Sequence, residues 1–550
     1  MHLKQYFQEY FTSDLKAGFI TAVVALPLAI AFAIASGVPP IMGIYTAIMA
    51  GLLGSLFGGS TYSITGPTGA MTVIILSAVS KYGIEGLMLA GFLAGVIQLL
   101  FGIVKLGRFV QFIPLPVVSG FTAGIGAIIF IGQIANGLGL KIAAHEHIWE
   151  TLAEIFRHLN QINIIAVGIT IGTILCLVYL AHLLGRFRYL RNLPSSLFPL
   201  VLFTAAVVVF QLAIPQVGEI PRGLPNFQMV RFNFELIQNV LPAAFTIALL
   251  GSIEALLCAV VCDGMTNTKH KSDKELMGQG IANVVMPFFG AMPATAAIAR
   301  SGVNIREGAK TKYAGVIHAL ILLLILLFFA PVAQYIPKAF LAGILMYVAV
   351  RMINVHEFKT IMKISRAESI VLFATFGLTV LTDLVFAVEV GMVLAVFLLF
   401  VRLTNIIDIS NMKDYQEHDG LNAFVYKNEK LKDVVTAYTI HGPFFFGAMS
   451  VFDKKINEHI EVKKPIIILR FKYVPFIDST ALVRLNEFIN QRKKEKGIVL
   501  IADANPTVYR TLKNNKEFMS LVKERYMFHK TKDALTYIEK NLHHILLNGK

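Results

Sequence analysis

The stretch STYSITGPTGAMTVIILSAVS at residues 60–80 decides the fold, together with its counterpart FFGAMPATAAIARSGVNIREG at residues 288–308. Each opens with small and hydroxyl residues, is interrupted by a proline (Pro67 or Pro293), and leaves room for only a short helix. Broken spans at matching places in the two halves of a chain indicate an inverted-repeat membrane protein with a binding site near the midplane. Two ordinary kinked helices are the alternative.

Composition supports a membrane protein. Hydrophobic residues make up 56% of the 550 positions and charged residues only 15%, with a mean hydropathy of +0.66, whereas soluble domains carry about 25% charged residues. Apolar stretches of helix-spanning length recur up to about residue 405, and an all-α polytopic membrane domain is therefore predicted. The expected spans are 17–36, 41–58, 66–80, 86–104, 116–135, 163–182, 195–214, 241–262, 276–290, 295–306, 313–333, 338–353, 368–382 and 384–404.

The net charge of +15 has a topological explanation. The basic residues of the apolar region lie at the ends of spans, as Lys269, Lys271 and Lys274 do, and not along one exposed face. Their excess in alternate loops follows the positive-inside rule and places both termini in the cytoplasm. No nucleic acid partner is expected; the lipid bilayer is the expected environment.

The chain becomes polar and mixed in charge after the last apolar stretch, and strand-like and helix-like patterns then alternate. This pattern predicts a small cytoplasmic α/β domain without a catalytic constellation. The expected organisation is a cytoplasmic N-terminus at 1–16, a transmembrane domain at 17–405, a linker at 406–430 and the α/β domain at 431–545.

The two half-helices predict an anion site. A helix that starts inside the membrane directs unpaired N–H groups and the positive end of its dipole toward the interior, and an anion is the natural ligand there. Small residues let a ligand approach the backbone. The expected donors are backbone groups around Thr68, Gly69 and Ala70 in one segment and around Ala296, Ala297 and Ile298 in the other.

Two charged residues fall near this site. Arg300 lies in the second short segment, where it either attracts substrate or extends its side chain to the membrane surface. Glu254 lies in the middle of an apolar span, where a carboxyl can alternate between protonated and ionised states. A purely structural carboxyl, paired with a helix end or with Arg300, is the alternative for Glu254.

No metal, cofactor or enzymatic centre is expected. Cys176, Cys258 and Cys262 lie in apolar spans without metal-ligand spacing. His145, His147 and His158 surround Trp149 in an amphipathic connection, which favours an interfacial face over a metal site. A membrane-embedded enzyme or sensor is disfavoured, because no nucleophile with a base and no phosphate loop is recognisable.

Longer stretches carry a resemblance. ALPLAIAFAIASGVPPIMGIYTAI (25–48), TGPTGAMTV (65–73) and the run from GSIEALLCAVVCDGM to SGVNIREGAKT (251–311) resemble the sulfate permease (SulP) family, the bacterial relatives of pendrin and prestin. GPFFFGA (442–448), PIIILRFKYVPFIDSTALVRL (465–485) and GIVLIADANP (497–506) are similar to a STAS domain. The resemblance covers nearly the whole chain.

The resemblance implies fourteen spans as two inverted seven-span repeats, divided into a core and a gate domain, in a homodimer of the bacterial inner membrane. It implies secondary transport of a small anion by elevator-like alternating access. Carried over by motif, Phe32, Thr68 and the segment from Ala296 to Arg300 would line the anion site. Glu254 would be the coupling carboxyl.

The coupling ion depends on departures from the family pattern. The sodium-coupled bicarbonate branch resembles this chain but has Asp at the place of Glu254 and hydroxyl residues at the places of Cys258 and Ile298. Sodium is a hard cation that prefers oxygen ligands, as calcium and magnesium do. The loss of two oxygens favours proton coupling through Glu254 over sodium.

The α/β domain carries Asp478-Ser479-Thr480-Ala481, which is similar to the phosphorylation loop of anti-anti-sigma factors. Ser479 or Thr480 could accept phosphate at a helix N-terminus. The alternative is an N-cap followed by an ordinary amphipathic helix.

The functional alternatives are a proton-coupled symporter and a channel or voltage-driven motor on the same scaffold. Glu254 favours the symporter, because coupling needs a titratable group. Sulfate is the favoured substrate, with bicarbonate and C4-dicarboxylates as alternatives.

Overall fold

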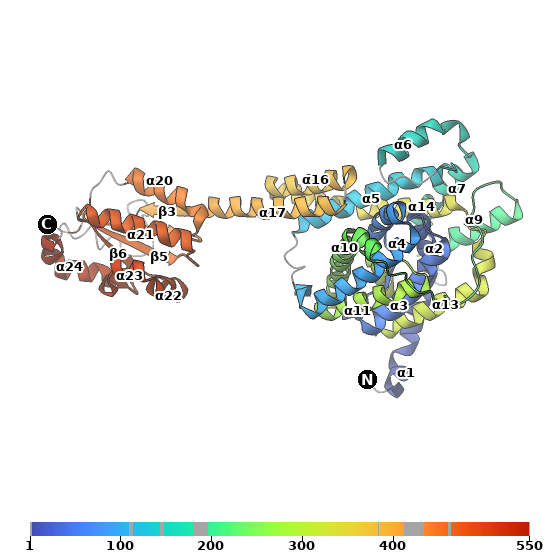
Figure 1. Ribbon diagram of the computed structural model, residues 1–550, viewed down its shortest axis with the longest axis horizontal. Helices are drawn as coiled ribbons and strands as arrows, with labels where there is room; N and C mark the ends of the chain where they lie inside the picture. Colours follow the sequence, from blue (N-terminus) through green and yellow to red (C-terminus); the bar gives the residue numbers. More distant parts are fainter. Residues whose placement is uncertain are drawn as a thin grey trace. The chain divides into compact units, whose positions relative to one another are not determined.

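The computed structural model describes residues 3–108, 114–142, 148–180, 196–382, 384–411, 431, 434–459 and 464–548. His145, His147 and most of the expected linker at 406–430 lie outside these residues. The chain divides into two compact units, Met1–Val393 and Leu394–Lys550 (Figure 1).

The first unit consists of helices joined by two very short strands. Its helices are α1 (Leu3–Glu9), α2 (Phe11–Ala35), α3 (Pro40–Phe57), α4 (Gly69–Ile103), α5 (Leu115–Gly137), α6 (Ile148–Arg157), α7 (Ile164–Leu175), α9 (Leu197–Val209), α10 (Phe234–Thr266), α11 (Ser272–Val285), α12 (Ile298–Arg306), α13 (Tyr313–Ala333), α14 (Lys338–Met352), α15 (Val355–Ile364), α16 (Arg366–Leu381) and α17 (Leu384–Ile406), the last of which continues into the second unit. Short turns are η2 (Leu159–Gln161), η3 (Cys176–Leu180) and η4 (Met286–Phe289), and the strands are β1 (Thr65–Gly66) and β2 (Thr295–Ala296).

Many of these helices suit a membrane. Within the described residues, eight helices are long and apolar enough to cross a bilayer, judged by length and composition. Gly83, with φ 69°, breaks α4 into the two helices that the sequence predicts at 66–80 and 86–104. The mostly helical polytopic fold is thus confirmed, while the number of fourteen spans stays a prediction.

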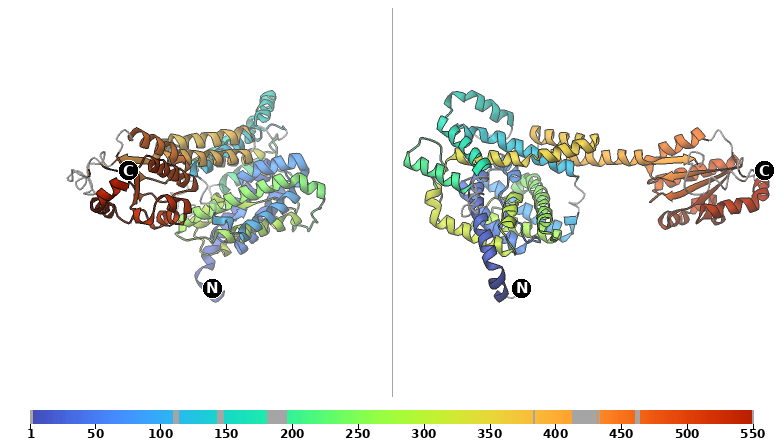
Figure 2. Two further views of the ribbon diagram at one scale, coloured as in Figure 1. Left: turned by 60° about the vertical axis from the view of Figure 1, so that its left-hand side comes forward. Right: turned by 180° about the vertical axis from the view of Figure 1, so that it is seen from behind.

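The helices pack in two groups (Figures 1 and 2). The first group joins α2, α3 and α4 to α10, α11, α12 and α13, and the second joins α5 to α7, α14, α15 and α16. Each group takes helices from both halves of the chain. Such intertwining is the arrangement expected of inverted repeats, and of a core and a gate domain.

The second unit is a small α/β layer structure, as predicted. Its sheet has the order β3 (Asp408–Asn411), β4 (Val435–His441), β5 (Ile466–Tyr473), β6 (Ile498–Ala502) and β7 (Met527–Phe528), in which only β3 is antiparallel to its neighbour. Its helices are α20 (Met449–His459), α21 (Ser479–Lys494), α22 (Pro506–Asn514), α23 (Lys516–Leu521) and α24 (Thr531–Asn548), with short turns η5 (Phe446–Ala448) and η6 (Glu524–Tyr526).

Alternation along β5 explains the two cores of this unit. Ile467, Leu469 and Phe471 face one buried cluster, which includes residues of α20 and α21, while Ile466 and Ile468 face a second cluster with α24. Period-two alternation with apolar residues on both sides is typical of a strand buried on both faces. Figure 1 shows helices on the two faces of this sheet.

Candidate functional site

The two broken segments meet in the first unit. β1 pairs antiparallel with β2, with Thr65 opposite Ala296 and Gly66 opposite Thr295. Because α4 begins at Gly69 and α12 at Ile298, this pairing brings two helix N-termini together. The two segments to which the sequence assigns the anion site, 68–70 and 296–298, thus lie next to each other.

The α4 terminus is capped by Thr68. Its side chain accepts a hydrogen bond from the Met71 amide at 3.4 Å. The amides of Gly69 and Ala70 lie in the first turn, where no intrahelical acceptor exists. Gly69 and Ala70 are two of the three residues, with Thr68, around which the sequence predicts backbone donors on this side.

Gly69 marks where the two helix groups approach each other. A Cβ on Gly69 would stand 2.7 Å from Ile129 Cδ1 of α5, 3.5 Å from Met352 Sδ of α14 and 3.6 Å from Phe32 Cε1 of α2. Phe32 therefore lies beside this terminus, as the resemblance implies. Ile129 and Met352 were not predicted, because nothing in their local sequence distinguishes them from other apolar span residues.

The α12 terminus has a different set of donors from the one predicted. The Ala297 amide donates to the Ile64 carbonyl at 3.0 Å, so it is engaged in the strand pairing. Ala297 is the N-cap residue and has no side-chain cap. The first-turn amides are consequently those of Ile298, Ala299 and Arg300. The predicted set of Ala296, Ala297 and Ile298 is shifted by two residues, because the helix begins later than the sequence pattern suggests.

Glu254 connects α10 to the cap of α4. The Thr68 hydroxyl donates to Glu254 Oε2 at 2.9 Å. Glu254 is partly exposed although its neighbours Ile253 and Ala255 are buried. The carboxylate thus lies directly behind the α4 terminus.

Arg300 is buried in the same place. Its side chain is 2% exposed, and Nη2 donates to the Pro67 carbonyl at 2.6 Å. A Cβ on Gly66 would stand 3.0 Å from Nη1 and Nη2, so the guanidinium packs directly on this glycine. The alternative of an arginine extending to the membrane surface is wrong. The positive charge instead lies against the strand pair, while the side chain of Ile298 is 43% exposed.

A polar stripe on α11 holds the crossing in place. Glu275, Gln279 and Asn283 recur every four residues and are all buried. Gln279 Nε2 donates to Thr65 Oγ1 at 2.9 Å, and Asn283 Oδ1 accepts from the Ala294 amide at 2.9 Å. The stripe therefore binds the Thr65 side chain on β1 and the backbone directly before β2. Its spacing within the apolar run ELMGQGIANVV is the signal that could have identified it.

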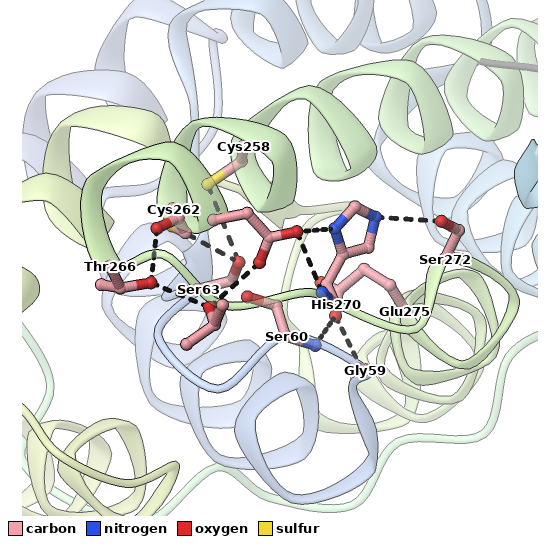
Figure 3. A network of polar contacts seen from close by, with 11 residues as sticks. Gly59, Ser60, Ser63, Cys258, Cys262, Thr266, His270, Ser272 and Glu275 are labelled. Carbon is pink, nitrogen blue, oxygen red and sulfur yellow. Dashed lines mark hydrogen bonds and ion pairs between the residues drawn. The ribbon is translucent and has the colours of Figure 1, made fainter. Parts of the chain in front are cut away.

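The first residue of this stripe also fixes the end of α3. Glu275 Oε2 accepts from the amides of Gly59 and Ser60, both at 2.8 Å (Figure 3). Two charge-assisted bonds satisfy backbone groups that would otherwise be buried without partners.

Figure 3 shows a second polar cluster on α10, one and two turns beyond Glu254. Ser63 lies 3.9 Å from the sulfur atoms of both Cys258 and Cys262. Cys258 Sγ also donates to Ser301 Oγ at 3.3 Å, and Ser301 Oγ accepts from the Ile64 amide at 2.8 Å. Thiols thus occupy the α10 face next to the strand pair.

The same figure shows the turn between α10 and α11. His270 Nδ1 lies 2.7 Å from Asp263 Oδ2, and His270 Nε2 lies 3.0 Å from Ser272 Oγ. The order of groups is that of a hydrolase triad, but Asp263 also accepts from the His270 amide at 2.9 Å. Asp263 lies near the end of α10, His270 between the helices and Ser272 at the start of α11, so these bonds close the connection between the two helices.

The loop at the start of α21 has an N-cap. Asp478 Oδ1 accepts from the Ala481 amide at 2.8 Å, and its Oδ2 accepts from the Phe446 amide at 3.0 Å. Ser479 and Thr480 are exposed. The cap predicted as the alternative is present, and both hydroxyls are accessible.

Comparison with known proteins agrees with this architecture. Residues 11–375 match the sulfate permease family and residues 426–531 match the STAS domain. YvdB of Bacillus subtilis, whose name describes it as a candidate sulfate transporter, is 40% identical over 96% of this chain and 98% of its own length. The bicarbonate transporter BicA of Picosynechococcus is 31% identical over 90% of this chain and 89% of its own.

Solved structures agree as well. The transmembrane domain of a cyanobacterial BicA aligns with a TM-score of 0.62 at 33% identity, covering 72% of this chain and 98% of that one. Murine Slc26a9 in its inward-facing state aligns with a TM-score of 0.85 at 18% identity, covering 97% of this chain and 92% of that one. With both of its parts matched over these lengths, the chain belongs to the sulfate permease family and carries a C-terminal STAS domain.

Proposed function

We propose that this protein is a secondary active anion transporter, a proton-coupled symporter of a small oxyanion, with sulfate as the first substrate to test. The observation that carries the proposal is the meeting of two helix N-termini beside a buried arginine and a carboxyl. First-turn amides of α4 and α12 and the Arg300 guanidinium together favour a negative ligand. The families and names of the relatives support transport and no enzymatic reaction.

The site would bind the anion mainly through backbone groups. Gly69 and Ala70 on one side, and Ile298 and Ala299 on the other, offer amides that need an acceptor. Phe32 and Gly69 would set how closely the anion approaches the α4 terminus. Such a site recognises charge and size, so related oxyanions compete.

Glu254 is the proposed coupling group. An ionised carboxylate accepts the Thr68 hydroxyl bond, whereas a protonated one also carries a proton that it can donate. Binding a proton removes a negative charge next to the anion site, so proton and anion binding would favour each other.

The mechanism we propose is elevator-like alternating access. The site is carried by the first helix group and faces Ile129 and Met352 of the second group at Gly69. Sliding of the first group past the second would expose the site to one side of the membrane and then to the other. We further propose a homodimer in the bacterial inner membrane with both termini in the cytoplasm.

Sodium-coupled bicarbonate transport is the second candidate, favoured by the similarity to BicA. Against sodium, the side chain at 258 is a thiol bonded to Ser301, and the side chain at 298 has no oxygen. Sodium would have to find oxygen ligands elsewhere. Proton-coupled C4-dicarboxylate transport and an uncoupled channel or exchanger are further alternatives.

Uptake into proteoliposomes tests these functions. Radiolabelled sulfate, bicarbonate and fumarate are offered under an inward proton gradient, an inward sodium gradient, or neither. We expect sulfate uptake driven by inward acid and abolished by Glu254→Gln. Sodium-driven uptake, or gradient-independent flux that survives Glu254→Gln, contradicts proton symport. Glu235→Gln, at the exposed first turn of the same helix, is the matched control.

A further inference from the structure

A buried histidine lies behind the half-helix site without a protein partner. His318 of α13 is 0% exposed, and neither Nδ1 nor Nε2 is hydrogen-bonded to any residue of the described chain. Burying a polar group without a partner destabilises the folded protein, and such groups in folded proteins are bonded to protein or to ordered water. The imidazole therefore needs a partner from outside the chain.

Two unpaired hydroxyls lie on the faces of α2 and α3 that pack against α13 near this histidine. A Cβ on Gly18 of α2 would stand 3.0 Å from the His318 backbone nitrogen, and a Cβ on Gly51 of α3 would stand 3.6 Å from His318 Nε2. Thr21 and Ser55 follow these glycines by three and four residues and thus lie on the same helix faces. Both hydroxyls are buried and have no partner among the described residues.

Arg300 borders this region from the side of the anion site. Its Nη2 donates to Pro67, but Nε and Nη1 have no hydrogen-bond partner in the described chain. The strand β1 on which the guanidinium packs contacts Gly54, one turn along α3 from Gly51. Arg300 and His318 therefore lie next to neighbouring turns of α3.

We propose that ordered water occupies the region bounded by Arg300, His318, Thr21 and Ser55, and that His318, through this water, is a positioning residue for the guanidinium. A buried water makes two to four hydrogen bonds. Nε and Nη1 of Arg300, the imidazole and the two hydroxyls provide enough donors and acceptors for such a water. The water holds the positive charge behind the first turn of α12, where it acts on the anion.

Radiolytic hydroxyl-radical labelling of the full-length protein in lipid nanodiscs tests the water directly. Radicals form from bound water in place, so a side chain next to ordered water is oxidised even when bulk solvent does not reach it. We expect oxidation of His318 at a rate at least about tenfold above that of Phe340, which is also 0% exposed but lies in an apolar core. Equal slow rates for His318 and Phe340 overturn the water site.

Transport kinetics test the positioning role, which rests on the proposed anion transport. His318→Leu removes the hydrogen bonds that hold the arginine through the water. It is expected to raise the KM for the anion by about tenfold, equivalent to about 1.4 kcal/mol, with Vmax within about twofold. His318→Asn retains a donor and an acceptor and is expected to restore most of the affinity. Thr21→Val is expected to raise the KM for the anion by a smaller factor than His318→Leu does.

The outcomes separate the two proposals. If His318→Leu and His318→Asn change KM equally, or if only Vmax changes, His318 has no positioning role. If the unmodified protein moves no anion, the proposed function fails, while the labelling contrast between His318 and Phe340 still decides the water site.

Discussion

The Thr68 hydroxyl donates a 2.9 Å hydrogen bond to the Glu254 carboxylate and at the same time caps α4 by accepting from the Met71 amide. One side chain thus joins the proposed anion donors to the proposed coupling group. Thr68 fixes the direction of the first-turn amides of α4. A change at Thr68 or at Glu254 is therefore expected to affect both the anion donors and the coupling group.

Thr68→Val tests this link, because valine keeps the shape and removes the hydroxyl. We expect anion uptake to fall by about 10- to 100-fold, through loss of the cap and of a hydrogen bond to a charged group. Thr68→Ser keeps the hydroxyl and should stay within a few-fold of the unmodified protein. Initial uptake rates in proteoliposomes check both; equal activity of the Val and Ser variants would contradict the role of the bond.

Gly69→Ala tests the close approach at the α4 terminus. The added methyl group would stand 2.7 Å from Ile129 Cδ1, which is closer than real Cβ contacts. We expect uptake to fall by about tenfold or more and Ile129→Ala to restore part of it in the double variant. Gly168→Ala is the control, since a Cβ there meets nothing within 4 Å. If Ile129→Ala restores no uptake in the double variant, the contact with Ile129 is not the cause of the lost activity.

Glu275→Gln tests the polar stripe on α11. The substitution keeps the size of the side chain but removes the negative charge of the carboxylate, whose oxygens accept hydrogen bonds from Gly59, Ser60 and Gln279. We expect a loss of about 1–3 kcal/mol in unfolding free energy, seen as a lower unfolding temperature in detergent, together with reduced uptake. The exposed Glu235→Gln change serves as control and should leave the unfolding temperature unchanged.

Asp478→Ala distinguishes a structural loop from a modified one in the STAS domain. Asp478 accepts from two backbone amides, so its removal should destabilise this domain by about 1 kcal/mol or more. Ser479→Ala should have little effect on stability, because the side chain is exposed. Hydrogen exchange at α21 in the full-length protein measures both. Phosphate found on Ser479 or Thr480 by mass spectrometry of protein from its native host would support the regulatory hypothesis.

The sequence predicts the broken segments well, because Gly66, Pro67 and Pro293 act locally on the backbone. It places the start of α10 seven residues too late, at 241 and not at Phe234, since polar residues such as Glu235 end the apolar pattern while the helix continues. Hydropathy detects the part of a helix that lies in lipid, and not the hydrogen-bonded turns beyond it.

The contacts that complete the site could not be predicted in the same way. β1 and β2 have two residues each and exist because they find each other across more than 200 positions of sequence. Their pairing consumes the Ala297 amide, which shifts the α12 donors to the residues that follow. Local pattern supplies the half-helices, whereas tertiary pairing decides which of their amides stay free.

His441 makes the stability of the STAS domain depend on pH. Its ring stacks on Tyr473 with centroids 4.8 Å apart, and burial, together with the nearby Arg470, lowers the pKa of His441, while Asp408 opposes the shift. The unfolded chain therefore binds the proton more readily than the folded domain. The contribution of His441 to the stability of the domain is complete above the ordinary histidine pKa of about 6.5. It declines as the pH falls from there toward the pKa of His441 in the folded domain.

We expect hydrogen exchange in β4 and β5 of the full-length protein to be faster at pH 5.5 than at pH 7.5, after correction for the intrinsic rates. His441→Phe keeps the aromatic stack and removes the titrating group, so its protection should be nearly the same at both pH values. His529→Phe is the matched control, because its ring also stacks on a tyrosine, Tyr509, in the same domain. If the pH dependence persists in His441→Phe but disappears in His529→Phe, His529 carries the effect, and the argument from the burial of His441 is contradicted.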